Sequence, residues 1–111
     1  MSRKSLKSHA VYAPVFAALG DTTRLALVEK LKDGGTRSIS QLTEGSELTR
    51  QAVTKHLRVL EGAQIVRSVR SGRESRFELN PVVIRQVRDY AEVVSAQWID
   101  ALARLKSFAE K

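Results

Sequence analysis

Between residues 47 and 79 the pattern of apolar residues changes from that of a helix to that of extended chain. In "ELTRQAVTKHLRVLEGAQIV" apolar residues recur three and four positions apart, whereas "IVRSVR" and "RESRFEL" flank the dipeptide "SG". The first stretch predicts an amphipathic helix capped by Thr49. The second predicts a β-hairpin with its tip at Ser71 and Gly72. A capped helix followed at once by a hairpin sets the fold class more strongly than either element alone.

A shorter helix is expected just before the capped one. Ser38 with Gln41 three residues later is a capping-box pattern, which predicts a helix starting at Ile39, and "EGSE" ends it. Two helices joined by a tight, glycine-containing turn, the second capped and cationic, form a helix-turn-helix.

The remaining elements complete a mainly α fold with a small hairpin, a winged helix-turn-helix with five helices. A short helix is expected over 11–19 with Pro14 in its first turn, and a long one after Asn80 and Pro81. Another begins after Asp21 or Thr22, ends at Gly34 and Gly35, and has a predicted buried stripe of Leu25, Leu27, Val28 and Leu31. One domain is expected, comprising a flexible basic tail (1–10), a winged helix-turn-helix core (11–80) and a C-terminal dimerisation helix (81–111).

Polar residues share one face of the capped helix. At about 100° per residue they fall within an arc of roughly 140°, opposite an apolar face that includes Val53, Val59 and Leu60. The face could simply be solvated. We favour DNA recognition, in which arginine and glutamine bond to base edges, lysine and threonine grip phosphate, and the helix N-terminus favours an anion. The candidate residues are Thr49, Arg50, Gln51, Thr54, Lys55 and Arg58.

Arginines also decorate the hairpin, at positions 67, 70, 73 and 76. Charged residues on a hairpin discourage edge-to-edge pairing, which is the simpler explanation. Arginine suits phosphate or minor-groove contact better, and we select Arg70 and Arg73 as DNA-binding wing residues. His56 falls among apolar positions, where a packed, hydrogen-bonded histidine is the favoured interpretation.

The last helix has an unbroken apolar seam with alternating spacings of three and four. Such a seam exceeds what a single winged domain needs, which favours a two-fold dimer over internal packing. A two-fold dimer predicts a symmetric DNA site with half-sites about one helical turn apart. The predicted interface residues are Ile84, Val87, Ala91, Val94, Trp98, Ala101, Leu105 and Phe108.

Composition excludes several other classes. The 111 residues contain no cysteine and carry a formal charge of +7, from 19 Lys and Arg against 12 Asp and Glu. Disulfides and thiolate metal sites are excluded, and a polyanionic partner is favoured. No membrane span or secretion signal is expected, so the predicted location is cytoplasmic. No catalytic constellation stands out, so neither an enzyme nor a cofactor is predicted.

The stretches "GDTTRLALVEKL", "LTRQAVTKHLRVLEGAQIV" and "SGRESRFELNP" together resemble the ArsR family of bacterial winged-helix repressors, over about Phe16 to Pro81. The resemblance implies a homodimer that occupies operator DNA and is released by a signal. Many members sense metal through Cys-x-Cys, for which this chain has Ser38 and Ser40. Another family site uses a histidine in the last helix, whereas no histidine follows His56. No metal site is therefore predicted.

Two questions stay open at this stage. Gln64 stands where relatives commonly carry a helix-closing glycine, so the residue is either strained in a left-handed conformation or the helix ends differently around Gly62. The second question is whether an unidentified small-molecule effector binds near Trp98, Tyr90 and Phe16. The competing function is a winged-helix interaction module that binds DNA without sequence preference.

Overall fold

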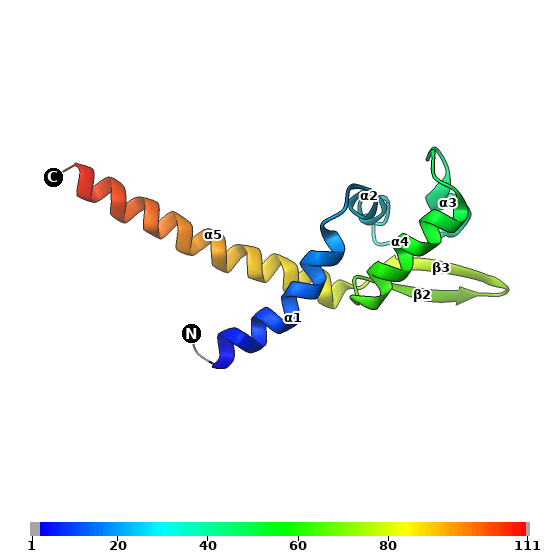
Figure 1. Cartoon of the computed structure of the whole chain (residues 1–111), viewed down its shortest axis with the longest axis horizontal. Coiled ribbons are helices and arrows are strands. Elements are labelled where there is room, and N and C mark those ends of the chain that lie inside the picture. The colour runs from blue at the N-terminus through cyan, green and yellow to red at the C-terminus, as the bar shows by residue number, and fades with distance from the viewer. Residues whose placement is uncertain (1–2, 111) are drawn as a thin grey trace. The chain divides into compact units, whose positions relative to one another are not determined.

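The computed structural model describes residues 3–110, which divide into one unit up to Pro81 and a second from Val82 onward. The fold is mainly helical with a three-stranded antiparallel sheet, which confirms the predicted winged helix-turn-helix (Figure 1). The elements in chain order are α1 (Arg3–Leu19), α2 (Thr22–Lys30), β1 (Arg37–Ser38), α3 (Ile39–Thr43), α4 (Arg50–Gly62), β2 (Val66–Ser71), β3 (Glu74–Leu79) and α5 (Pro81–Ala109).

Side-chain caps fix where three helices begin. Asp21 accepts a hydrogen bond from the Arg24 backbone N–H at 3.0 Å, which starts α2. Ser38 and Gln41 form the predicted capping box of α3, with bonds of 3.2 and 2.9 Å. Thr49 Oγ1 accepts from the Ala52 N–H at 3.1 Å and starts α4. Each cap satisfies backbone donors that a helix leaves unpaired, so the local sequence determines these boundaries.

The core of the first unit gathers the inner faces of its helices around the sheet. Two predictions about it are wrong, because Leu25 is 50% exposed and Val59 45% exposed, although both were expected on buried faces. In neither helix does the periodic pattern alone show how far the buried arc extends. The fully buried side chains are Leu31, Leu42, Val53, Leu57, Leu60, Ile65 and Val66.

The sheet contains one strand that the sequence did not predict. The strand order is β1-β3-β2, and β1 pairs Arg37 with Phe77 and Ser38 with Arg76. The partners of a two-residue strand lie far along the chain, so no local periodicity marks it. β1 places the capped start of α3 directly beside the hairpin.

The hairpin tip lies at Gly72 and Arg73, one residue later than predicted, since Ser71 pairs with Glu74. Gly72 has a φ of 62°, and Arg73 is not among the positive-φ residues of the described chain. This is the pattern of a type II′ turn, in which only the first central residue, usually glycine, has a positive φ. A tip at residues 71 and 72 would have set arginines opposite each other, 67 against 76, which is unfavourable. The observed register instead pairs Arg67 with Glu78.

The first helix begins at Arg3, so the predicted start at Val11 is wrong; the helix includes Arg3–Ala10, which were expected in the basic tail, while residues 1–2 lie outside the described residues. Lysine, leucine, arginine and alanine are good helix formers, and nothing in this segment breaks a helix. Pro14 is consequently inside α1, not in its first turn. The second helix, α2, is shorter than predicted, because it ends at Lys30 and not at Gly34 and Gly35.

At the end of α4 the strained alternative for Gln64 is the observed one. Gln64 has a φ of 64°, while Gly62 is still helical. The Ile65 N–H donates to the Leu60 carbonyl and the Gln64 N–H to the Glu61 carbonyl, both at 3.0 Å. These two bonds define a Schellman ending, which normally has glycine at the left-handed position.

Candidate nucleic-acid interface

The exposed face of α4 carries cationic and amide side chains without partners. Arg50, Gln51 and Lys55 are all exposed, and none makes a side-chain hydrogen bond or ion pair within residues 3–110. The face is rigidly supported, because Val53, Leu57 and Leu60 on the opposite side are buried. Three adjacent unpaired polar side chains on a firmly held helix are available to an external polar ligand.

The other three predicted residues of this helix have contacts of their own. Thr49 Oγ1 is the N-cap acceptor, and Thr54 Oγ1 donates to the Arg50 carbonyl at 2.7 Å. Arg58 lies 3.2 Å from Glu61 Oε1, with 69% of its side chain exposed. Glu61 Oε2 in turn accepts from Ser68 Oγ at 2.6 Å, a link from α4 to β2 that sequence reasoning missed. Arg58 is thus held by an intramolecular acid at the end of the face.

His56 lies off the cationic face, in a small polar cluster. Its Nδ1 is 3.3 Å from Arg24 Nη1 and 3.7 Å from Asp21 Oδ2, and its side chain is 26% exposed. Asp21 has a lowered pKa, chiefly because the Arg24 backbone N–H bonds to its carboxylate, and also because of the nearby charges of Arg24 and His56. The cluster joins the start of α2 to α4, which supports the structural interpretation of His56.

The hairpin arginines divide into two that pair with acids and two that do not. Arg67 bonds to Glu78 at 2.7 Å and Arg76 to Glu74 at 3.2 Å, so these two are paired with acids. Arg70 and Arg73 are exposed; Arg70 Nε donates to the Gly72 carbonyl at 3.3 Å, and Arg73 has no side-chain partner among the described residues. The two arginines that the sequence analysis selected are therefore the two without acidic partners.

Arg73 and Arg50 come together although they lie 23 positions apart. Both line a cavity of about 220 Å³ between the start of α3, the start of α4 and the hairpin. Ser40 and Ser75 also line it, and the sequence analysis did not select either for this role. Their only sequence signals are the capping box, which places Ser40 in the first turn of α3, and the hairpin register, which pairs Ser75 with Arg70.

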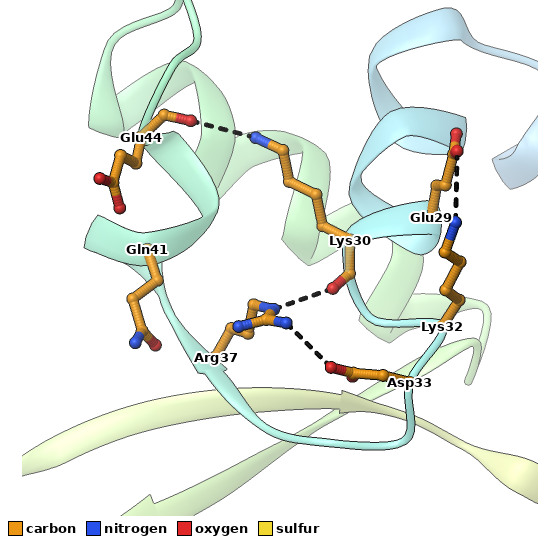
Figure 2. A pocket seen from close by; sticks show the side chains of 7 residues that line it. All are labelled: Glu29, Lys30, Lys32, Asp33, Arg37, Gln41 and Glu44. Carbon is orange, nitrogen blue, oxygen red and sulfur yellow. Dashed lines mark hydrogen bonds and ion pairs between the residues drawn. The ribbon is translucent and has the colours of Figure 1, made fainter.

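A larger hollow of about 440 Å³ lies between α2, β1 and α3, and its cations are already engaged (Figure 2). Lys30 Nζ donates to the Leu42 and Glu44 carbonyls at 2.9 and 3.3 Å. Arg37 donates to the Lys30 carbonyl and to Asp33, each at 2.9 Å. These contacts fasten the end of α2 to its neighbours, so the hollow offers little unpaired charge to a ligand.

All eight residues of the predicted seam lie on the single helix α5. Its later members are strongly exposed in the single chain, with Trp98 and Leu105 each at 65% and Phe108 at 77%. Ile84, Val87 and Ala101 are intermediate, Ala91 and Val94 are exposed, and Val83, which the prediction omitted, is buried. Ile99 is 60% exposed but lies outside the seam.

Two other kinds of site are absent from the part of the chain that the structure describes. No three histidine, aspartate or glutamate side chains gather there as metal ligands could. None of its helices combines the length and the apolar character needed to cross a lipid bilayer.

Comparisons with known proteins agree with this geometry. Residues 19–69 match a family model described as a helix-turn-helix domain. An ArsR-like transcriptional regulator from Rhodococcus sp. RHA1 is 34% identical, with a TM-score of 0.77 over 93% of this chain and 96% of that one. The transcriptional repressor SdpR of Bacillus subtilis is 28% identical over 71 residues, 64% of this chain and 78% of SdpR.

Another solved structure shares this fold. The homodimeric winged helix-turn-helix DNA-binding domain of Mb0332 from Mycobacterium bovis has a TM-score of 0.68, covering 89% of this chain and 91% of that one. At 17% identity, this structural likeness shows a shared fold alone. Together with the match to the Rhodococcus regulator over nearly its whole length, these findings identify the protein: the chain belongs to the ArsR family of winged helix-turn-helix DNA-binding transcriptional regulators.

Proposed function

We propose that the chain is a homodimeric repressor that occupies a two-fold symmetric operator through the exposed face of α4 and the hairpin wing. The observation that carries the proposal is the set of unpaired side chains on α4, Arg50, Gln51 and Lys55. A face needed only for solubility would not require an amide between two long cations. Of the four hairpin arginines, Arg67 and Arg76 have acidic partners, so Arg70 and Arg73 are the two left available to DNA.

Within this face the residues have different tasks. Gln51 can bond bidentately to adenine, and Lys55 is suited to phosphate. Thr49 and Thr54 position the helix, because their hydroxyls bond to its backbone. Arg58 and the wing residues Arg70 and Arg73 supply further cations.

A dimer follows from the α5 seam. Trp98, Leu105 and Phe108 are too exposed in the single chain for a large apolar stripe to stay in water. The description of Mb0332 as homodimeric supports the same assembly for this chain. On this proposal residues 11–80 form the DNA-binding core and residues 81–111 the dimerisation segment. The name of SdpR as a repressor supports repression through operator occupancy.

The proposal includes no catalytic activity, no cofactor and no metal. Regulators of this family act by binding, and Ser38 and Ser40 offer no thiolate at the positions matching the family's cysteines. A regulator that binds a bacterial chromosome works in the cytoplasm. The candidate release signal is an organic molecule that binds at the dimer interface.

Fluorescence anisotropy on the promoter fragment of the protein's own gene and on a scrambled fragment, each across a salt series, tests the proposal. The native fragment is expected to bind at least about a thousandfold tighter. Gln51→Ala should cost about 1–3 kcal/mol on the native fragment and little on the scrambled one. Lys55→Ala should weaken both and flatten the salt slope. Equal binding of both fragments by the wild-type protein contradicts the proposal and favours an interaction module.

A further inference from the structure

We propose that the cavity between α3, α4 and the wing holds one phosphate of the DNA backbone, gripped jointly by Arg50 and Arg73. This phosphate clamp, comprising Arg50, Arg73, Ser40 and Ser75, rests on the proposed DNA binding and refines it. It makes Arg50 a residue that positions the protein on the duplex, where its place on the recognition helix would suggest a reader of bases.

The charge of the cavity favours an anion. Arg50 and Arg73 bring two guanidinium groups that have no partner within residues 3–110. The acid lining the same cavity, Glu74, is already bound to Arg76 Nη1 at 3.2 Å. Arg76 is itself fixed, since it donates to the Thr36 hydroxyl and carbonyl, both at 2.9 Å. The fixed Arg76 neutralises Glu74, so the cavity keeps the two positive charges of the arginines.

The remaining lining groups also suit phosphate. Ser40 and Ser75 carry hydroxyls that can donate to phosphate oxygens, and Ser38, whose oxygen accepts from the Gln41 N–H in the cap of α3, also lines the cavity. Guanidinium groups bind phosphate through paired, charge-assisted hydrogen bonds. The volume of about 220 Å³ is ample for a phosphate group with some of its waters, since one ordered water needs roughly 10–15 Å³ of such space.

The position of Arg50 on α4 favours phosphate over a base edge. Arg50 is the first helical residue, and it also lines a second hollow with Ser40 and Thr43 of α3 and with Glu44, which follows α3. It therefore lies on the side of α4 that faces α3. In a helix-turn-helix the first helix crosses the DNA backbone while the second enters the major groove. A side chain between the two helices meets the backbone first.

A double-mutant cycle tests the clamp, using Arg50→Ala, Arg73→Ala and the double variant on native and scrambled duplexes across a salt series. If both arginines grip one phosphate, each single variant should weaken binding to both duplexes about tenfold. Each should also lower the salt slope by about 0.9, and the double variant should lose little more. Losses that multiply in the double variant, or an Arg50→Ala loss confined to the native duplex, overturn the proposal.

Lys32→Ala is the matched charge control. Lys32 is exposed in the turn that follows α2 and pairs with Glu29 at 3.7 Å, so its removal changes net charge without touching the clamp. It should alter binding much less than either arginine variant. An equal effect of Lys32→Ala would show that only the overall charge matters, and would overturn the clamp. Circular dichroism of each variant confirms that the exposed substitutions leave the fold intact.

Uncharged methylphosphonate linkages, placed one at a time in the native duplex, locate the contact. One linkage in each half-site should weaken wild-type binding about tenfold and leave the double variant unaffected. If every sensitive linkage stays sensitive in the double variant, the clamp is refuted. Failure of the proposed function gives a different result, because the wild-type protein would then bind native and scrambled duplexes alike. In that case the double-mutant cycle on scrambled DNA would still test the clamp.

Discussion

Gln64 occupies a backbone conformation that ordinarily selects glycine. Its φ of 64° closes the Schellman ending of α4, and the side chain is exposed. A residue with a Cβ in this conformation costs on the order of 1 kcal/mol relative to glycine. Gln64→Gly is therefore expected to raise the free energy of unfolding by about 1 kcal/mol, measured by urea denaturation at fixed protein concentration.

Gln64→Ala provides the matched control for this substitution. Alanine removes the glutamine side chain but keeps the Cβ, so it should not give the gain expected from glycine. If alanine and glycine stabilise the protein equally, the glutamine side chain and not its backbone conformation is the source of the strain. Unchanged m-values are needed for either comparison, because they show that the same surface is exposed on unfolding.

Asp21 makes stability depend on pH at the acidic end. Its pKa is lowered in the folded protein by the hydrogen bond from the Arg24 N–H and by the charges of Arg24 and His56. A carboxyl whose folded-state pKa lies below its unfolded value contributes stability that is present above the unfolded pKa and lost as pH falls through the folded pKa. The contribution should therefore be complete near pH 7 and fade below about pH 4.

Asp21→Asn isolates this effect, because the amide oxygen can still accept the capping bond while the charge is lost. The variant should be less stable than wild type near pH 7, and the difference should shrink as pH falls from 5 to 3. Thermal unfolding at a series of pH values measures it. A difference that stays constant over that range would show that the carboxylate charge contributes nothing beyond the cap.

Elements whose signals are local could be predicted, and those that depend on distant partners could not. The caps at Ser38 and Thr49 follow from residues within one turn, and both are confirmed. Strand β1 exists because Arg37 meets Phe77, forty positions away. The hairpin tip was one residue wrong, and a one-residue change of register alters every cross-strand pair. Which arginines have acidic partners was consequently not predictable from the sequence.

In the candidate nucleic-acid interface too, local features could be predicted from the sequence and contacts between distant elements could not. Periodicity placed Arg50 and Lys55 on one exposed face, because that depends on the helical repeat alone. The meeting of Arg50 with Arg73 and Ser75 depends on how the wing packs beside α3, which β1 establishes. Exposure of Leu25 and Val59 has the same kind of origin, since the extent of a buried face is set by neighbouring elements.

Glu61 links the recognition helix to the wing and restrains Arg58. It accepts from Arg58 at 3.2 Å and from Ser68 at 2.6 Å. Glu61→Gln keeps an acceptor for Ser68 but removes the charge that holds Arg58. We expect tighter binding to native and scrambled DNA alike, with a salt slope steeper by about 0.9, as one more phosphate contact gives. Fluorescence anisotropy across a salt series measures both quantities.

Glu29→Gln is the control for Glu61→Gln. It makes the same charge change on α2, where Glu29 pairs with Lys32 and both side chains are more than 70% exposed. Exposed pairs of this kind contribute little, so its salt slope should match that of wild type. A steeper slope for both variants would mean that net charge, and not release of Arg58, explains the result.

At the scale of the whole molecule, the proposed dimer makes a prediction about affinity, because two copies of the chain would act together on one operator. Under the proposed function, one α4 face with its wing contacts one half-site, and linking two such units makes the second contact effectively intramolecular. Loss of the dimer should therefore reduce affinity for a full operator to that for a half-site, even with every DNA-contacting side chain intact. In the proposed dimer, the α5 seam provides this coupling.

Two neighbouring residues of α5 allow a matched test of the seam. Trp98 lies on it and Ile99 about 100° away around the helix, although the two are similarly exposed, at 65% and 60%. A carboxylate buried in an apolar interface without a partner is strongly unfavourable, whereas one in water is not. Trp98→Glu should therefore give a monomer by analytical ultracentrifugation and half-site affinity for the operator. Ile99→Glu should remain dimeric and bind as wild type does. Dissociation by both variants would place the interface on a wider face of α5, and dissociation by neither would place it elsewhere.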